Sequence, residues 1–306
     1  MSFASAIKSE LSKQKASRIC CRTAECYGIL LFGRSFSLNG ISFMTESSDA
    51  AHCAAQMIAQ VSGAIVETKR ILRRAEHTAF IVSVEDIEDR RKILNMFGHD
   101  GNEIHLLLNH AVLENECCLS AFLRGAFLSC GTGVDPQKEY RLEFVVPHFH
   151  LAKSLSAILT EVPELALQPI ISRRQGTYVV YLTGGDRISD FLTYLGAVQS
   201  SMEVMQTKML KEVRNNVNRK TNFETANIGK TASAAALQIE AIERFLNLGG
   251  WTAIPEELRE LAEKRYENPE LSLRELGQSL ETPLSRSGVN HRLQKLMELS
   301  EKLQKH

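Results

Sequence analysis

The feature of this sequence that most constrains its fold is an internal repeat in its N-terminal two thirds. An apolar, helix-like segment at residues 26–31 (CYGILL) has a central glycine, and a similar segment recurs at residues 123–128 (LRGAFL). A repeat of this size indicates two copies of one structural unit that complete each other's core. The chain of 306 residues is also long enough for about two domains.

Both copies continue with the same order of elements. In the first copy, strand-like and helix-like segments follow at 36–46, 48–61, 64–72 and 79–84, and a helix closes near Gly98. In the second copy they follow at 132–147, 149–162, 167–172 and 177–183, and a helix closes near Gly196. This order (helix, two strands, helix, two strands, helix) predicts an α+β domain with pseudo-twofold symmetry, its strands on one face and its helices on the other. We place the domain at residues 1–205, with copies at about 20–105 and 117–200.

The two glycines have a physical role in this arrangement. Glycine inside a helix costs about 1 kcal/mol relative to alanine. Two helices recover that cost when they pack backbone to backbone, so Gly28 and Gly125 predict a close helix pair along the pseudo-twofold axis.

Residues 123–131 (LRGAFLSCG) resemble the LAGLIDADG motif of homing endonucleases, and residues 26–34 resemble it less closely. In those nucleases an acidic residue near the end of each motif helix holds the metal that activates water. The matching positions here are Gly33 and Cys130, which offer no carboxylate, whereas such metals need hard oxygen ligands. Asp135 lies beyond the helix in a turn with Pro136. The resemblance therefore implies a nuclease-like fold without catalytic residues.

The seven cysteines all lie within the first 130 residues and form no C-x-x-C pair. We interpret them as free thiols of a reducing compartment. A zinc site made by Cys20, Cys21 and Cys26 is an alternative, but their spacing does not match that of zinc ligands. The expectation is a protein with no metal and no cofactor.

The N-terminal segment has no signal-peptide core and reads as a short amphipathic helix with Phe3, Ile7 and Leu11 on one face. No stretch is apolar enough to span a membrane. We therefore expect a cytoplasmic protein that associates with the nucleoid and has no membrane partner.

The net charge is zero, but basic residues gather in several places. Arg73-Arg74 and Arg173-Arg174 lie at equivalent places before the hairpin turns of the two copies. Residues 206–227 are polar and asparagine-rich, which predicts a linker, and they contribute Arg214, Arg219 and Lys220. These seven side chains are candidate contacts to phosphates. The alternative is that they are solvated charges, which at a sheet edge prevent aggregation.

Residues 228–306 predict a small helical domain. A helix at 231–246 is stopped by Gly249-Gly250, and a second helix runs from Pro255 to Asn268. Ser272 then caps a short helix at 273–280, a turn follows at 281–284, and Ser285 caps a longer helix. A short helix, a tight turn and a capped helix with a basic outer face are typical of a helix-turn-helix.

In a helix-turn-helix the second helix enters the major groove of DNA and reads base edges near its N-terminus. Arginine, asparagine and glutamine are the side chains that read guanine and adenine. The candidate DNA-binding residues are Arg286, Ser287, Asn290, His291, Arg292, Gln294 and Lys295, together with Arg274 of the preceding helix. The alternative is an ordinary helical hairpin with a solvated face.

The whole chain resembles the WhiA family of bacterial transcriptional regulators. The motifs that carry this resemblance are Cys20-Cys21-Arg22, residues 122–128 (FLRGAFL), 186–192 (DRISDFL), 218–227 (NRKTNFETAN) and 284–293 (LSRSGVNHRL). The resemblance implies a degenerate LAGLIDADG domain tethered to a helix-turn-helix like the promoter-reading region of sigma factors. It also implies roles in cell division, chromosome segregation and sporulation.

The sequence therefore predicts a non-catalytic regulator of transcription that binds double-stranded promoter DNA, with a co-regulator or an RNA polymerase component as a further candidate partner. Two alternatives stay open. One is a protein-interaction scaffold that the small domain tethers to DNA. The other is a residual metal-dependent nuclease that uses a carboxylate such as Asp135.

Overall fold

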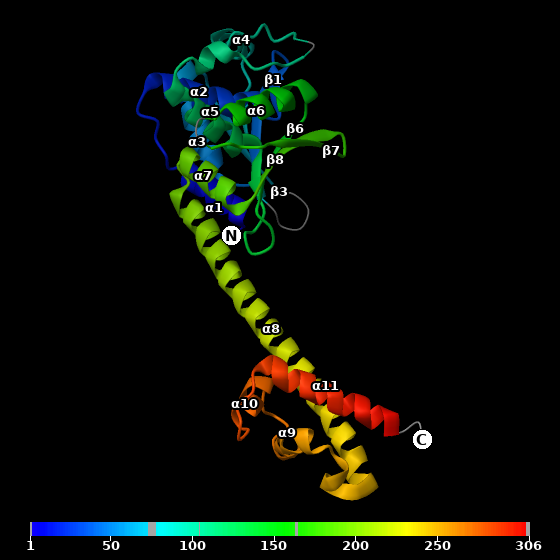
Figure 1. Ribbon diagram of the computed structural model, residues 1–306. Coiled ribbons are helices and arrows are strands. Elements are labelled where there is room, and N and C mark those ends of the chain that lie inside the picture. Colours follow the sequence, from blue (N-terminus) through cyan, green and yellow to red (C-terminus); the bar gives the residue numbers. More distant parts are fainter. Residues whose placement is uncertain (1, 73–77, 104, 163–164, 304–306) are drawn as a thin grey trace. The chain divides into compact units, whose positions relative to one another are not determined.

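The computed structural model describes residues 2–72, 78–103, 105–162 and 165–303. The chain divides into two compact units, Met1–Lys211 and Glu212–His306. Figure 1 shows the helices and strands of both units.

The first unit opens with α1 (Phe3–Leu11), and Ser2 caps this helix by accepting a hydrogen bond from the Ser5 amide. The first copy then comprises α2 (Ile19–Leu31), β1 (Ser35–Ser37), β2 (Gly40–Thr45), α3 (Ser48–Ser62), β3 (Glu67–Leu72), β4 (Thr78–Val84) and α4 (Ile87–Met96). The second comprises α5 (Glu116–Cys130), β5 (Gly131–Gly133), β6 (Arg141–Val146), α6 (Phe149–Glu161), β7 (Ile170–Arg174), β8 (Thr177–Thr183) and α7 (Gly185–Leu195). The predicted order of elements is confirmed in both copies.

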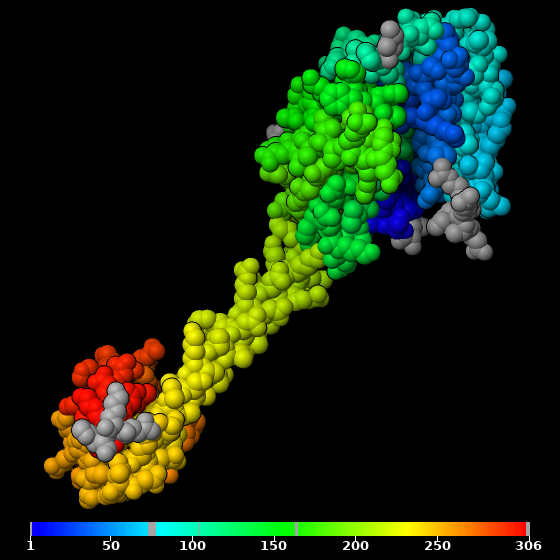
Figure 2. Space-filling view, turned by 90° about the vertical axis from the view of Figure 1, so that its right-hand side faces the viewer, coloured from blue at the N-terminus to red at the C-terminus, as the bar shows by residue number. Residues whose placement is uncertain are grey.

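Each copy forms its own antiparallel four-stranded sheet, and the strand orders β1-β2-β4-β3 and β5-β6-β8-β7 are the same. In β2 the buried side chains alternate with half-buried ones, as expected for a strand with one face on the core. Phe43 lies opposite Val82 in the first sheet, and Phe144 lies opposite Val180 in the second. The two copies lie side by side in Figure 2, the first in blue to cyan and the second in green.

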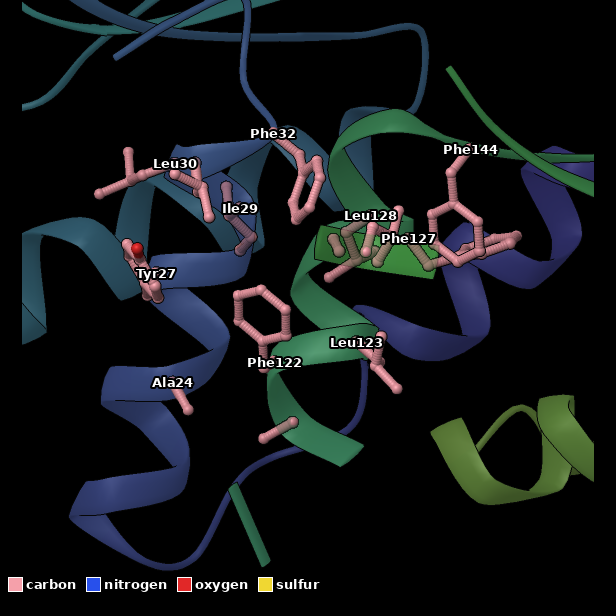
Figure 3. Close-up of a cluster of buried hydrophobic side chains, with 14 of the residues drawn as sticks. Ala24, Tyr27, Ile29, Leu30, Phe32, Phe122, Leu123, Phe127, Leu128 and Phe144 are labelled. Carbon is pink, nitrogen blue, oxygen red and sulfur yellow. The ribbon is translucent and has the colours of Figure 1, made fainter. Parts of the chain in front are cut away.

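Helices α2 and α5 meet backbone to backbone between the two sheets. A methyl group added at Gly125 would lie 2.1 Å from the carbonyl oxygen of Glu25, and one at Gly28 would lie 2.3 Å from that of Phe122. No other residue fits at either point, so the predicted role of the two glycines is confirmed. Figure 3 shows Phe122 pointing from α5 toward α2, and its ring centroid lies 5.8 Å from that of Tyr27.

The helix that follows α7 differs from the sequence-based expectation. We predicted a linker at 206–227 and a helix from Thr231, whereas α8 is one helix over Val198–Gly249. Asparagine lowers helix propensity without breaking a helix, and this segment contains no proline. Glu10 stabilises the first turn, because its carboxylate accepts hydrogen bonds from the amides of Gln199 and Ser200 at 2.6 and 3.0 Å.

The second unit packs three helices, α9 (Glu256–Glu267), α10 (Leu273–Gln278) and α11 (Arg286–Leu303), around the C-terminal part of α8. Gly250 has a φ of +68° at the end of α8, which confirms that the Gly249-Gly250 pair stops that helix. Ile242 and Phe245 of α8 pack against Leu258 of α9 and Leu296 of α11. A second apolar cluster joins α9, α10 and α11.

Candidate nucleic-acid interface

The first helix of the predicted helix-turn-helix, α10, is short and strongly capped. Ser272 accepts a hydrogen bond from the backbone amide of Glu275, and the Glu275 carboxylate accepts one from the amide of Ser272 at 2.9 Å. This reciprocal pair fixes the start of the helix. Leu276 is fully buried against Leu261 and Leu293, so α10 is held against both neighbouring helices.

The turn between α10 and α11 depends on one glycine. A methyl group at Gly277 would lie 2.4 Å from the Leu284 carbonyl oxygen and 3.0 Å from a methyl group of Val289. The Leu284 amide also donates a hydrogen bond to the Gly277 carbonyl at 3.0 Å. The turn therefore closes directly onto α10, which sets the angle at which α11 leaves it.

Helix α11 begins after Ser285, whose hydroxyl accepts a hydrogen bond from the Gly288 amide at 3.2 Å. Val289, Leu293 and Leu296 are buried at helical spacing. Their burial fixes which side of α11 faces solvent. The predicted cap and apolar face are both present.

The structure separates the predicted DNA-binding residues of α11 into two groups. The exposed residues are Arg286, Ser287, Asn290, His291 and Gln294, which lie on the side opposite the buried face. Arg292 is half-buried, and the Lys295 ammonium forms an ion pair with Glu257 of α9. Those two residues are therefore less available to a ligand than the sequence pattern indicated.

Arg274 joins the exposed group from α10. A groove of about 370 Å³ is lined by Lys230 and Gln238 of α8, Arg274 of α10, and Arg286 and Asn290 of α11, among others. The side-chain oxygen of Gln238 is buried there without a hydrogen-bond partner among the described residues. Lys230 belongs to the basic stretch at residues 205–230, whereas no sequence signal pointed to Gln238, because the helix predicted at 231–246 was expected to face the core.

The buried side chain of Arg265 also lines this groove. Its guanidinium donates hydrogen bonds to the carbonyl oxygens of Pro269 and Leu271, at 3.2 and 2.8 Å. Burial lowers the pKa of Arg265 from its usual value. The side chain ties the end of α9 to the loop that leads into α10 and is structural rather than available to DNA.

The candidate phosphate contacts of the first unit differ in their exposure and in their ion pairing. Arg73 and Arg74 lie outside the described residues. Arg173 is exposed next to the hairpin turn of β7 and β8, whose residues Gln175 and Gly176 both have positive φ. Arg174 is also exposed, but its guanidinium lies 3.3 Å from the Glu143 carboxylate. The charge of Arg174 is therefore partly compensated.

Arg214, Arg219 and Lys220 are exposed on α8 within the second unit. Lys208, earlier in the same helix, differs from them because it pairs with Asp186 of α7. The availability of the three exposed cations to a polyanion stays a prediction that the structure does not test.

The positions that match the nuclease metal ligands, Gly33 and Cys130, lack carboxylates, and Cys130 lies near a lysine. Burial raises the pKa of the Cys130 thiol to about 12. Burial also lowers the pKa of the nearby Lys8 ammonium to about 8, against smaller opposite effects of Cys130 and Glu46. Lys8 and Glu46 line a pocket of about 690 Å³ beside Gly131. The Lys8 cation and the Glu46 carboxylate thus lie together beside the C-terminal end of α5.

Asp135 behaves as a turn residue. Its carboxylate accepts a hydrogen bond from the Gln137 amide at 2.8 Å, and its carbonyl accepts one from the Lys138 amide. This is the local pattern that aspartate supplies in turns.

Four of the cysteines lie together, and they are not the three that were considered as zinc ligands from the sequence. Cys20 and Cys21 lie next to Cys117 and Cys118, and the four sulfur atoms lie within 4.8 Å of one another. Cys26 is fully buried elsewhere in the core and does not join them. The grouping of Cys20 and Cys21 with Cys26, considered on sequence grounds, is therefore wrong.

Comparison with known proteins gives matches along the whole chain. The family described as the WhiA LAGLIDADG-like domain matches residues 119–214, and the WhiA C-terminal HTH domain matches residues 217–300. A protein of Caldicellulosiruptor bescii named probable cell division protein WhiA is 36% identical, over 100% of this chain and 96% of its own length. One of the same name from Alkaliphilus oremlandii is 37% identical over 99% of this chain and 98% of its own.

Among solved structures, the crystal structure of full-length DUF199/WhiA from Thermatoga maritima matches with a TM-score of 0.61 at 23% identity, over 99% of both chains. At this identity the likeness concerns the fold, which is a LAGLIDADG-like domain followed by a helix-turn-helix domain. Among the described helices, none is both long and apolar enough to cross a membrane.

Proposed function

The chain belongs to the WhiA family, and from this premise we propose that it is a non-catalytic, sequence-specific DNA-binding regulator of transcription. Its relatives are named probable cell division proteins. We extend that role to this chain as regulation of genes for cell division, chromosome segregation and sporulation. The proposal places the protein on the nucleoid in the cytoplasm, at promoter regions, with a co-regulator or an RNA polymerase component as a further partner.

The observation that carries the proposal is the exposed side of α11. Arg286, Asn290 and Gln294 lie there at four-residue spacing, close to the start of the helix. These are the side-chain types that form paired hydrogen bonds with guanine or adenine in the major groove. The opposite side of α11 is fixed in the core by Val289 and Leu293, so the reading side is presented in one orientation.

The surroundings of this surface favour a polyanion. Lys230 and Arg274 line the same groove as Arg286, so three exposed cations from three helices lie along it. Phosphate contacts of this kind set the register of a protein on DNA, whereas the base contacts supply specificity. We assign Lys230 and Arg274 to the phosphates and Asn290 to a base.

The proposal that the first unit has no nuclease activity is supported by the chemistry at Gly33 and Cys130. Neither residue offers an oxygen ligand from its side chain, and the Lys8 ammonium lies close to the Cys130 thiol. Magnesium and manganese prefer carboxylate, carbonyl and water oxygens. Titration calorimetry of the full chain with either metal should show no tight site in this unit. Specific binding with micromolar affinity, accompanied by nicking of supercoiled plasmid, would support the nuclease alternative.

The binding proposal is tested by measuring the affinity of the full chain for a selected target duplex and for a random duplex of equal length. Asn290→Ala and Arg286→Ala should each weaken binding to the target by about 1–3 kcal/mol and change binding to random DNA much less. Lys302→Ala is the control, because Lys302 is an exposed cation near the far end of the same helix. Equal losses on both duplexes would mean that α11 does not read bases.

A further inference from the structure

Four cysteine side chains converge where the N-terminal ends of α2 and α5 lie together. The Cys20 sulfur lies 3.9 Å from the Cys117 sulfur and 4.0 Å from the Cys21 sulfur. With Cys118 included, all four sulfurs lie within 4.8 Å of one another. These four residues form the cysteine cluster.

The repeat explains why these residues meet. Cys20-Cys21 and Cys117-Cys118 occupy the same positions in the two copies, one residue after the start of α2 and of α5. The glycine contact at Gly28 and Gly125 holds the two helices together at backbone distance. The cysteine cluster therefore lies on the pseudo-twofold axis and receives two sulfurs from each copy.

The spacing of the sulfurs matches that required by one tetrahedral ion. Zinc binds thiolate sulfur at about 2.3 Å, so the sulfurs of a tetrahedral four-cysteine site are about 3.8 Å apart. The separations of 3.9 and 4.0 Å are close to that value, and the others need only small side-chain rotations. An iron–sulfur cluster places several irons and sulfides between its thiolates, and so would spread the four sulfurs further apart.

The surroundings favour a thiolate at Cys117, whereas burial raises the pKa of Cys21 to about 11 and that of Cys118 to about 12, so an ion must displace the protons of these two thiols. The positive ends of two helices meet there, because all four cysteines lie in the first turns of α2 and α5. The Arg18 guanidinium donates a hydrogen bond to the Cys117 sulfur at 3.6 Å. The Cys21 thiol donates a hydrogen bond to the Cys117 carbonyl at 3.3 Å, a contact that the thiol gives up when an ion replaces its proton. Cys20 and Cys117 are half-buried, which gives an ion access from solvent, whereas Cys21 and Cys118 are buried.

We propose that Cys20, Cys21, Cys117 and Cys118 bind a single zinc ion that joins the two copies of the first unit. A site with four protein ligands leaves no open position for substrate, so its role is structural rather than catalytic. Binding replaces the thiol protons with the ion, and these protons are released to solvent. The ion would link the N-terminal ends of α2 and α5, whereas the contact at Gly28 and Gly125 holds the middle of the two helices together.

The test begins with the metal content of the full chain, purified under reducing conditions without chelator and measured by mass spectrometry of the elements. We expect about one zinc ion per chain. After exchange with cobalt, the chain should show thiolate-to-cobalt charge transfer in the near ultraviolet and the intense red-end bands of tetrahedral cobalt. This spectrum needs no variant, so it tests the site even if a variant fails to fold.

Variants then assign the ligands. Cys20→Ser and Cys117→Ser should each weaken zinc binding by about tenfold or more in competition with a chromophoric chelator. Cys53→Ser is the matched control, because Cys53 is half-buried on α3 and lies outside the cysteine cluster. It should retain the zinc affinity and the cobalt spectrum of the unaltered chain.

Several outcomes would overturn the assignment. One is a reduced chain that holds no zinc and takes up none from a buffered zinc solution. Another is iron and sulfide in stoichiometric amounts with visible absorption, which would indicate an iron–sulfur cluster. A Cys20–Cys117 disulfide in chain isolated from cells without oxidation would assign the cluster to redox chemistry. Equal loss of metal in Cys53→Ser and Cys117→Ser would show that the loss reflects unfolding and not ligation.

Discussion

The ion pair between Glu25 and Arg124 lies inside the contact of α2 and α5. The Arg124 guanidinium donates two hydrogen bonds to the Glu25 carboxylate, at 2.8 and 2.7 Å, and that carboxylate has no exposed side-chain surface. Burial raises the pKa of Glu25, and Arg124 opposes this effect. The carboxylate of Glu25 therefore depends on Arg124 for its charge.

This dependence gives a prediction at the scale of one residue. Arg124→Met should destabilise the first unit by about 3–5 kcal/mol, because it leaves a buried carboxylate without its partner. The double variant Glu25→Leu, Arg124→Met should recover much of the loss, since it removes both charges together. Calorimetric unfolding of the full chain measures both effects. A double variant as unstable as the single one would show that Arg124 acts through packing and not through charge.

Lys8 gives a prediction about pH. Burial lowers its pKa from the usual 10.5 to about 8 in the folded chain. Between those values the unfolded chain binds more protons than the folded one, so the stability contributed by this group rises with pH across the window and is constant below it. Lys8→Met should therefore stabilise the chain at neutral pH, by about 1–2 kcal/mol for a half-buried lysine.

The measurement is the difference in unfolding free energy between Lys8→Met and the unaltered chain, followed from about pH 7 to about pH 11 to bracket both pKa values. The difference should shrink as pH rises from about 8 toward 10.5. Subtraction removes the titration of groups that do not interact with Lys8. A difference that does not change with pH would contradict the lowered pKa.

At the scale of elements, the close contact of α2 with α5 requires glycine at positions 28 and 125, because a Cβ atom at either position would clash. Gly125→Ala should destabilise the first unit by about 2 kcal/mol or more, although alanine has the higher helix propensity, because its methyl group meets the Glu25 backbone. Gly229→Ala is the matched control in α8, where an added methyl group meets nothing within 4 Å. This second change should stabilise its helix by about 0.5–1 kcal/mol.

The single tryptophan, Trp251, lies in the second unit, so its fluorescence follows the unfolding of that unit. Calorimetry follows both units and reports on Gly125→Ala. If Gly125→Ala lowered the unfolding free energy no more than Gly229→Ala does, the backbone contact between α2 and α5 would not be as close as described.

The elements also show how far a sequence can predict this fold. The internal repeat and its turn residues predicted the order of both copies, and helical spacing with capping residues predicted the helix-turn-helix. The extent of α8 was missed, since its exposed stretch lacks an apolar stripe and is held by helix propensity and the Glu10 cap. The cysteine cluster was missed because adjacent cysteines do not match zinc-ligand spacing and their partners belong to the other copy. The partial burial of Arg292 and the pairing of Lys295 with Glu257 depend on tertiary packing, which residue types alone do not reveal.

At the scale of the whole molecule, the first unit offers a second set of cations that could meet DNA. Arg173 is exposed beside a hairpin turn, and Arg73 and Arg74 occupy the equivalent place in the sequence of the other copy. Binding of these side chains and Arg174 to phosphates would add affinity without specificity. The logarithm of the binding constant falls linearly with the logarithm of the salt concentration, and each phosphate that the protein neutralises adds about 0.9 to the steepness of this line.

We therefore expect that replacing Arg73, Arg74, Arg173 and Arg174 by alanine weakens binding to every DNA alike and flattens its salt dependence. The control removes the same charge from elsewhere in the first unit, at Arg91, Lys92, Lys138 and Lys153. Affinities at several salt concentrations measure the slope for both variants. An unchanged slope in the hairpin variant would favour a protein partner for the first unit.

The central claim is that α11 selects the DNA sites of this protein, and mapping bound DNA across the genome tests it most directly. The full chain should occupy discrete promoter sites that share a sequence motif, and Lys302→Ala should occupy the same sites. The variant Arg286→Ala, Asn290→Ala should lose these sites and retain only diffuse binding, since its phosphate contacts carry no sequence information. If the double variant kept the same sites at the same relative occupancy, sequence selection would lie outside α11 and the central claim would be contradicted.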